Sequence, residues 1–178
     1  MFRPFVHTII VAIALAQGVP MGPQSYDVPE AYKVYSILLE TSNQPILIQG
    51  RTIPLVVNPK MLRQRCEFGA TAADEFVKVN KSEWVLEDKF TSKTPYTMLS
   101  PQDIGEMDSF RNIFGRRYYF IFSPVGFNAE KTIALVAIIG ANGRFDGKGR
   151  IAVLQKTAGV WREVECGKEP FVVILGRK

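Results

Sequence analysis

The chain has almost no histidine: among its 178 residues there is one, His7. His7 lies in an N-terminal stretch predicted to be removed on export, so we expect the mature protein to contain none. Histidine is the usual proton carrier near neutral pH and the commonest metal ligand. Its absence excludes Ser-His-Asp and Cys-His nucleophile systems and nearly every zinc, copper or haem site. The sequence therefore predicts no metal, no cofactor and no catalytic residue.

Cysteine is also scarce, with two residues, Cys66 and Cys166. In an exported protein the two could form a disulfide. Closing a loop of about 100 residues would stabilise the fold by about 4 to 5 kcal/mol in the entropic description. Two separate buried thiols, each acting as a small core residue, are the alternative. The sequence leaves both open.

Concentrated charge of one sign is missing as well. The formal net charge is +5, but acidic and basic residues are interspersed without a run of five or six like charges. Residues 116–119 (Arg-Arg-Tyr-Tyr) join charge to aromatic rings, as proteins that bind single-stranded nucleic acids do. The same pattern is typical of a helix end followed by a strand, which we favour. No nucleic-acid partner is therefore expected.

No apolar run reaches the roughly 20 residues that span a bilayer. The N-terminus instead has the parts of an export signal: Arg3 without an acid, an apolar run over 8–15, and Ala14-Leu15-Ala16 before the cut. A buried N-terminal helix is the alternative. We expect a secreted or periplasmic protein without a transmembrane segment after cleavage. Its predicted parts are a signal peptide (1–16), a flexible tether (17–26) and a single domain (27–178).

Three helices are predicted in the first two thirds of the chain. Asp27-Val28-Pro29-Glu30 is typical of a helix start, because Asp27 can cap the first turn and Glu30 stands three residues on. Residues 71–74 and 100–103 have similar capping patterns and predict helices that end near Val79 and Gly115. Residues 46–57 are rich in β-formers, but Gly50 and Pro54 interrupt them, which favours an edge strand or a bulge.

Strand patterns dominate from Tyr118 onward. Successive candidates lie at 118–125, 133–139, 149–156 and 160–165, with 171–175 as a fifth. Their short connections require antiparallel neighbours. Residues 133–139 are apolar at every position, which predicts a central strand covered on both faces. The expected fold is α+β, with N-terminal helices packed on a C-terminal antiparallel β-meander of four to five strands.

Two motifs stand in this C-terminal half. Residues 123–128 read S-P-V-G-F-N, and residues 153–161 fit V-L-x-K-x-x-G-x-W. Together they resemble a family of uncharacterised bacterial exported proteins, which implies export and a shared fold but no reaction. Members often carry a cysteine pair in the glycine-rich loop between the motifs. This chain has no cysteine there, so a disulfide or metal role in that loop does not carry over.

The glycine-rich loop from Gly140 to Arg150 is the best local candidate for a ligand site. Glycines let backbone N–H groups approach an anion, and Arg144, Lys148 and Arg150 add positive charge. The loop is not a phosphate-binding Walker loop, because Asn142 and Gly149 replace required residues. A long hairpin connection is the alternative, and we favour it.

Two clusters of acids, Glu83 with Glu87 and Asp88, and Asp103 with Glu106 and Asp108, raise the question of glycoside hydrolysis. That chemistry needs two carboxyl groups about 5 to 9.5 Å apart across a cleft. We favour solvated faces for both clusters. Strand alternation puts Trp161 and Glu163 on one face, where packing is the expected role of Trp161.

The sequence as a whole favours a small exported protein that binds or modulates an envelope or extracellular ligand without catalysis. Such a protein should have a surface groove lined by aromatic residues, without converging titratable groups. A carboxylate-dependent hydrolase acting on glycans is one alternative. A structural envelope assembly protein, which would bury a flat apolar patch, is the other.

Overall fold

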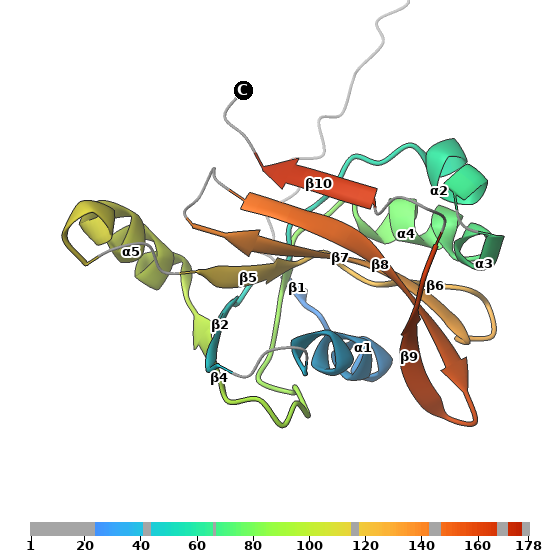
Figure 1. Cartoon of the computed structure of the whole chain (residues 1–178), viewed down its shortest axis with the longest axis horizontal. Helices are drawn as coiled ribbons and strands as arrows, with labels where there is room; N and C mark the ends of the chain where they lie inside the picture. Colours follow the sequence, from blue (N-terminus) through green and yellow to red (C-terminus); the bar gives the residue numbers. More distant parts are fainter. Residues whose placement is uncertain are drawn as a thin grey trace, which may run out of the picture.

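The structure is a computed structural model of the chain. It describes residues 24–40, 44–65, 67–114, 118–142, 147–166 and 171–175. Within these ranges the protein has the expected α+β fold, a mixed sheet with helices on both of its faces (Figure 1). The helices are α1 (Pro29–Leu39), α2 (Pro59–Arg65), α3 (Glu67–Ala70), α4 (Ala73–Val79) and α5 (Pro101–Phe114).

The main sheet has eight strands in the order β10-β8-β7-β5-β2-β4, with β6 paired to β7 and β9 paired to β8. A separate pair, β1 and β3, runs parallel. The strands are β1 (Gln24–Ser25), β2 (Ile46–Gln49), β3 (Trp84–Val85), β4 (Tyr96–Leu99), β5 (Tyr119–Phe122), β6 (Gly126–Phe127), β7 (Ile133–Ala141), β8 (Gly147–Thr157), β9 (Val160–Val164) and β10 (Phe171–Leu175).

The C-terminal strands are antiparallel as predicted, since β5, β6 and β8 pair with β7, and β9 pairs with β8. β10 departs from the predicted meander order, because it pairs with β8 rather than with its neighbour in sequence, β9. The order of helices first and strands last is only roughly right, because β2 and β4 also join this sheet, in parallel. Of the two alternatives for residues 46–57, the edge strand is wrong. β2 ends at Gln49 and lies between β4 and β5, so Pro54, which lacks an N–H donor, falls outside the strand.

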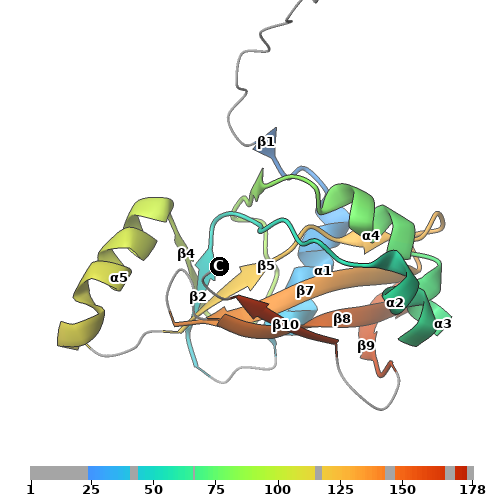
Figure 2. The same cartoon turned by 90° about the horizontal axis from the view of Figure 1, so that it is seen from above.

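Strand β7 is central and covered on both faces, as its apolar sequence predicts. Ala134 and Val136 belong to the same core cluster as α1. Leu135 and Ala137 point the other way, into a cluster with Phe76 of α4. Figures 1 and 2 show this arrangement, with α1 on one side of the sheet and α2, α3 and α4 on the other.

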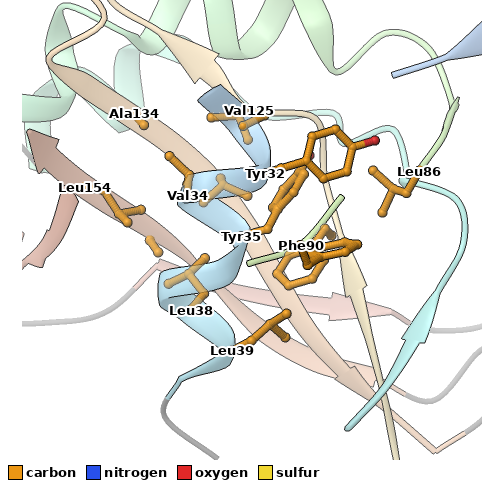
Figure 3. Close-up of a cluster of buried hydrophobic side chains, with 14 of the residues drawn as sticks. Tyr32, Val34, Tyr35, Leu38, Leu39, Leu86, Phe90, Val125, Ala134 and Leu154 are labelled. Carbon is orange, nitrogen blue, oxygen red and sulfur yellow. The ribbon is translucent and has the colours of Figure 1, made fainter. Parts of the chain in front are cut away.

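Helix α1 buries one face against the sheet (Figure 3). Its side chains Val34, Tyr35 and Leu38 are at most 3% exposed. The ring of Tyr35 lies 4.6 Å from that of Phe122 of β5, measured between centroids. Burying each such side chain stabilises the fold by about 1.5 to 3 kcal/mol, so this helix is a principal source of stability.

The predicted helix starts are right in position but only one has the predicted cap. Ser100 and Asp103 cap α5 reciprocally: the Asp103 N–H donates to Ser100 Oγ (3.2 Å) and the Ser100 N–H to Asp103 Oδ2 (2.6 Å). The N-cap of α1 is Val28 and that of α4 is Ala72, and neither has a side-chain cap. Asp27 instead forms an ion pair with Lys89 (3.2 Å), which takes it away from the helix end.

Within the described ranges, no helix combines the length and the apolar character that crossing a membrane requires.

Candidate ligand-binding surface

The S-P-V-G-F-N motif holds the fold together. The carbonyl oxygen of Ser123 accepts a hydrogen bond from the Tyr35 hydroxyl (2.9 Å), and its Oγ accepts one from the Ala137 N–H (2.8 Å). The Val125 N–H donates to the hydroxyl of Tyr26 (2.9 Å). The motif therefore links the N-terminal segment and α1 to the centre of the sheet.

The end of the motif shapes the turn before β7. Asn128 Oδ1 accepts hydrogen bonds from the N–H groups of Thr132 and Ile133, both at 2.8 Å. Gly126 packs directly on α4, because a Cβ there would lie 2.2 Å from the Cα of Phe76. These residues are explained by backbone geometry, so the motif is structural and contains no reactive group in an open site.

The second motif is tied to α1 through Glu30. The Glu30 carboxylate accepts hydrogen bonds from Lys156 Nζ and Trp161 Nε1, both at 2.6 Å, and pairs with Lys33 at 3.1 Å. The hydrogen bond from Lys156 is the largest cause of a pKa for Glu30 of about 2; burial opposes it, and the bond from Trp161 adds to it. The predicted capping role of Glu30 is therefore wrong. Trp161 is 4% exposed, in agreement with the packing role expected for it.

The acids considered for hydrolysis are held by surface partners. Glu83 pairs with Arg51 (3.2 Å), Glu87 with Lys89 (2.7 Å), and Asp88 accepts a hydrogen bond from the Tyr96 hydroxyl. Glu106 accepts one from Gln102 (3.1 Å). The side chain of Asp108 lies outside the described part.

The electrostatics of these acids do not suit proton donation. Hydrogen bonds from Lys89 lower the pKa of Glu87, and hydrogen bonds from Ser100 lower that of Asp103. A general acid for glycan cleavage needs a raised pKa. The pKa values of Glu30, Glu87 and Asp103 are all lowered instead, so each of these three carboxyl groups is stabilised in its charged form.

The three basic residues predicted to form an anion site do not act as a set. Arg144 lies outside the described residues. Arg150 faces Glu163 and forms a two-pronged ion pair with it, with Nη2 and Oε2 2.9 Å apart. Lys148 is exposed and has no ion-pair partner among the described residues. Of the two described members of the set, Lys148 is therefore the one without an ion-pair partner in the described ranges.

Lys148 stands in a row with Gly140, the first residue of its predicted loop, and with Phe120, which the sequence does not single out. It pairs with Gly140 of β7, and Gly140 pairs with Phe120 of β5. Paired residues of antiparallel strands share a face, so the row faces the side of the sheet that α1 covers. The Ala141 end of β7 and the Gly147 end of β8 extend past α1 (Figure 1).

Aromatic rings flank Gly140 in this row. Atoms of the Tyr118 and Phe120 rings (Cδ1 and Cε1) lie 3.9 and 4.0 Å from the place a Cβ of Gly140 would occupy. Both rings thus reach over the glycine, an arrangement that compensates for its missing side chain. Tyr118 remains 65% exposed. We call Tyr118, Phe120, Gly140 and Lys148 the aromatic platform.

The platform combines two kinds of recognition. The rings offer apolar surface, and Lys148 offers a cation two strands away, about 10 Å along the row. The members of the platform come from three separate strand regions. The sequence identifies Lys148 as part of a candidate anion site and Tyr118 as part of the Arg-Arg-Tyr-Tyr motif, but it does not predict that the two lie close together. The sequence carries one signal of this proximity: two neighbouring aromatic residues at the start of one strand, and a glycine in the strand that pairs with it.

Cys166 is disulfide-bonded and is partly buried against the cluster that contains Leu62 and Phe76. Cys66, the other cysteine of the chain, lies outside the described residues. The bonded state of Cys166 favours a disulfide over two separate thiols. The pairing of Cys166 with Cys66 stays a prediction. Among the described residues, no group of three or more potential metal ligands comes together.

Comparison of the chain with models of protein families, with curated proteins and with solved structures gives no match. The resemblance to bacterial exported proteins accordingly stays a prediction.

Proposed function

We propose that this protein is exported and acts outside the cytoplasm by binding a ligand, without catalysing a reaction. The observation that carries the proposal is the row Phe120–Gly140–Lys148, in which aromatic surface shares one face of the sheet with a cation that has no ion-pair partner among the described residues. The signal-like residues 1–16 support export. Rigid aromatic side chains provide contact area at a low entropic cost, which suits a binding surface.

The hydrolase alternative has less support. It requires two carboxyl groups facing each other across a cleft, with one in an environment that raises its pKa. Glu87 and Asp103 are instead surface acids stabilised as carboxylates. Glu30 is half-buried, but its two close donors, Lys156 and Trp161, belong to the fold.

A purely structural assembly role also has less support. Such a role requires one continuous apolar patch. Large exposed apolar side chains come from different parts of the described chain: Val56 and Met61 on one segment, Tyr118 before β5 and Val160 in β9. Tyr118 is the one that the platform connects to Lys148, a cation without an ion-pair partner in the described part of the chain.

The experiment that tests binding is a fragment screen on the secreted protein, with backbone amide shifts read by NMR, which a 20.0 kDa chain allows. We expect fragments to shift the amides of Phe120, Gly140 and Lys148 and to be recovered unchanged. Hits confined to another surface, or steady conversion of a glycan, would overturn the proposal.

Export is tested on the same material. Non-reducing mass spectrometry of the secreted product should give an N-terminus after Ala16 and a mass that increases by about two hydrogens on reduction, as for one disulfide. Retention of residues 1–16 in a cytoplasmic product would contradict the export part of the proposal.

A further inference from the structure

We propose that residues 24–27 form a strap that opens and closes as one unit while the rest of the fold stays intact. The strap contains β1 and lies just before α1. Its opening uncovers an aromatic slot beneath it and releases a backbone N–H of the S-P-V-G-F-N motif. The strap shares no residue with the aromatic platform.

One buried side chain anchors the strap. Tyr26 is 4% exposed, and its ring lies 5.8 Å from that of Trp84 and 6.3 Å from that of Tyr35, measured between centroids. The two residues before it, Gln24 and Ser25, are exposed. Undocking the strap therefore exposes one buried ring, whereas unfolding α1 exposes several buried side chains and costs more free energy.

Residues of three other segments hold the strap through hydrogen bonds. The Tyr26 N–H donates to the carbonyl oxygen of Val85 (2.8 Å), and the Tyr26 carbonyl oxygen accepts a bond from the Tyr32 hydroxyl (3.0 Å). The hydroxyl of Tyr26 accepts a bond from the Val125 N–H (2.9 Å), 99 residues further along the chain. All three bonds include Tyr26, so they break together when this residue leaves its slot.

Two exposed contacts close the strap at the surface. The Ser25 hydroxyl donates to the Glu87 carboxylate, and Asp27 forms an ion pair with Lys89 at 3.2 Å. Exposed contacts of this kind contribute little, so they adjust the closed population rather than enforce it. Among the described strands, β1 pairs with β3 alone, over two residue pairs. Short segments with one neighbour open at a lower free energy than the core of a fold.

Opening of the strap changes the surface beneath it. The Val125 N–H loses its acceptor, and the Val85 carbonyl oxygen loses its donor. The rings of Tyr32 and Trp84, 6.5 and 5.8 Å from that of Tyr26, lose this neighbour. The open form thus presents aromatic surface beside an unpaired donor and an unpaired acceptor. The strap therefore couples the N-terminal segment to the S-P-V-G-F-N motif.

Hydrogen exchange of the secreted protein, read by NMR, tests the strap. The Tyr26 and Val125 amides should have the same protection factor, within about five-fold, although 99 residues separate them. Both should exchange at least about ten-fold faster than the amide of Ala137, which donates to Ser123 Oγ in the centre of the sheet. Low concentrations of urea should speed exchange strongly at Ala137 and weakly at the strap, because opening the strap exposes little surface.

Variants at the surface contacts show whether the two amides open together. Asp27→Asn removes the ion pair with Lys89 and should lower both protection factors by one common factor, about two- to five-fold, because a single opening exposes both amides. Ser25→Ala removes the other contact and should act in the same direction. Arg63→Gln, which removes an exposed ion pair with Asp74 elsewhere, is the matched control and should leave both protection factors unchanged.

Three results would overturn the strap. Protection factors of Tyr26 and Val125 that differ by more than about five-fold would mean that the two amides open separately. Exchange less than about ten-fold faster than at Ala137, with the same dependence on urea, would mean that the strap opens only when the whole protein unfolds. An Asp27→Asn variant in which the two amides do not shift together is the third. None of these results bears on the platform, where fragment binding is read from other amides.

Discussion

The carboxylate of Glu30, in the first turn of α1, accepts a hydrogen bond of 2.6 Å from the indole N–H of Trp161, 131 residues further along the chain. Lys156 donates to the same oxygen at 2.6 Å and lies 5.6 Å from the centroid of the Trp161 ring. One acid thus fixes the β8–β9 hairpin to the helix.

Replacement of Glu30 by glutamine should lower the free energy of unfolding by about 1 to 2 kcal/mol. Glutamine retains an acceptor for Trp161 but removes the charge that pairs with Lys156. Urea denaturation of the secreted protein measures the change. Glu75→Gln, which removes the exposed pair of Glu75 with Lys78, is the matched control and should cost less than about 0.5 kcal/mol. Equal effects of the two variants would contradict the role given to Glu30.

Acid should weaken the same contact. The pKa of Glu30 is about 2 in the folded protein, against an ordinary value of 4.5. Because the unfolded chain takes up this proton first, the contribution of Glu30 is complete above pH 4.5 and is lost as the pH falls toward 2. The free energy of unfolding should therefore fall more between about pH 6 and about pH 3 in the parent than in Glu30→Gln, as denaturation at the two pH values measures. An identical pH dependence in both proteins is the contrary result.

Alkali should act on Tyr26, a buried tyrosine just before α1. Burial raises the pKa of Tyr26 to about 12 from its ordinary value of 10. The folded state holds this proton more tightly than the unfolded chain, so stability is complete below pH 10 and is lost as the pH rises toward 12. Tyr26→Phe should be less stable at neutral pH by about 1 to 3 kcal/mol, because the Val125 N–H loses its acceptor. It should also lose less stability above pH 10 than the parent, which denaturation across this range tests.

Two glycines of the sheet should respond oppositely to alanine. At Gly126 a Cβ would lie 2.2 Å from the Cα of Phe76, a backbone contact that cannot yield without moving α4. Gly126→Ala should therefore cost about 3 kcal/mol or more. At Gly140 the nearest atoms are 3.9 Å away, so Gly140→Ala should be neutral or stabilising by up to about 1 kcal/mol. Thermal denaturation of both variants compares them directly, and a Gly126→Ala protein as stable as the parent would refute the close packing of β6 on α4.

Much of this fold could be predicted from local patterns. The apolar run of β7 and the glycine-containing turns indicated an antiparallel sheet, because short connections permit no other pairing. The parallel placement of β2 between β4 and β5 could not be predicted in the same way. β2 has four residues, and its partners are set by packing of segments that lie tens of residues away. Glu30 illustrates the same limit: its local spacing favoured a cap, but its partners are in the distant hairpin.

The candidate surface was predictable only in part. Lys148 was identified because charged residues flank glycines in its loop. Gly140 was identified only as the start of that loop and Phe120 not at all, because only the register of β5, β7 and β8 brings them beside Lys148. Arg150 was included with Lys148, yet Glu163 of β9 neutralises it, a contact that depends on strand pairing rather than on sequence spacing.

The most direct test of the binding account compares the fragment screen of the parent with that of a Tyr118→Ala, Lys148→Gln double variant. The account predicts that fragments which shift the Phe120 and Gly140 amides of the parent no longer do so in the double variant. They should still bind a Val160→Ala, Lys81→Gln double variant, whose changes lie elsewhere on the surface. Fragments that bind all three proteins equally would contradict the assignment of the platform as the ligand-binding surface.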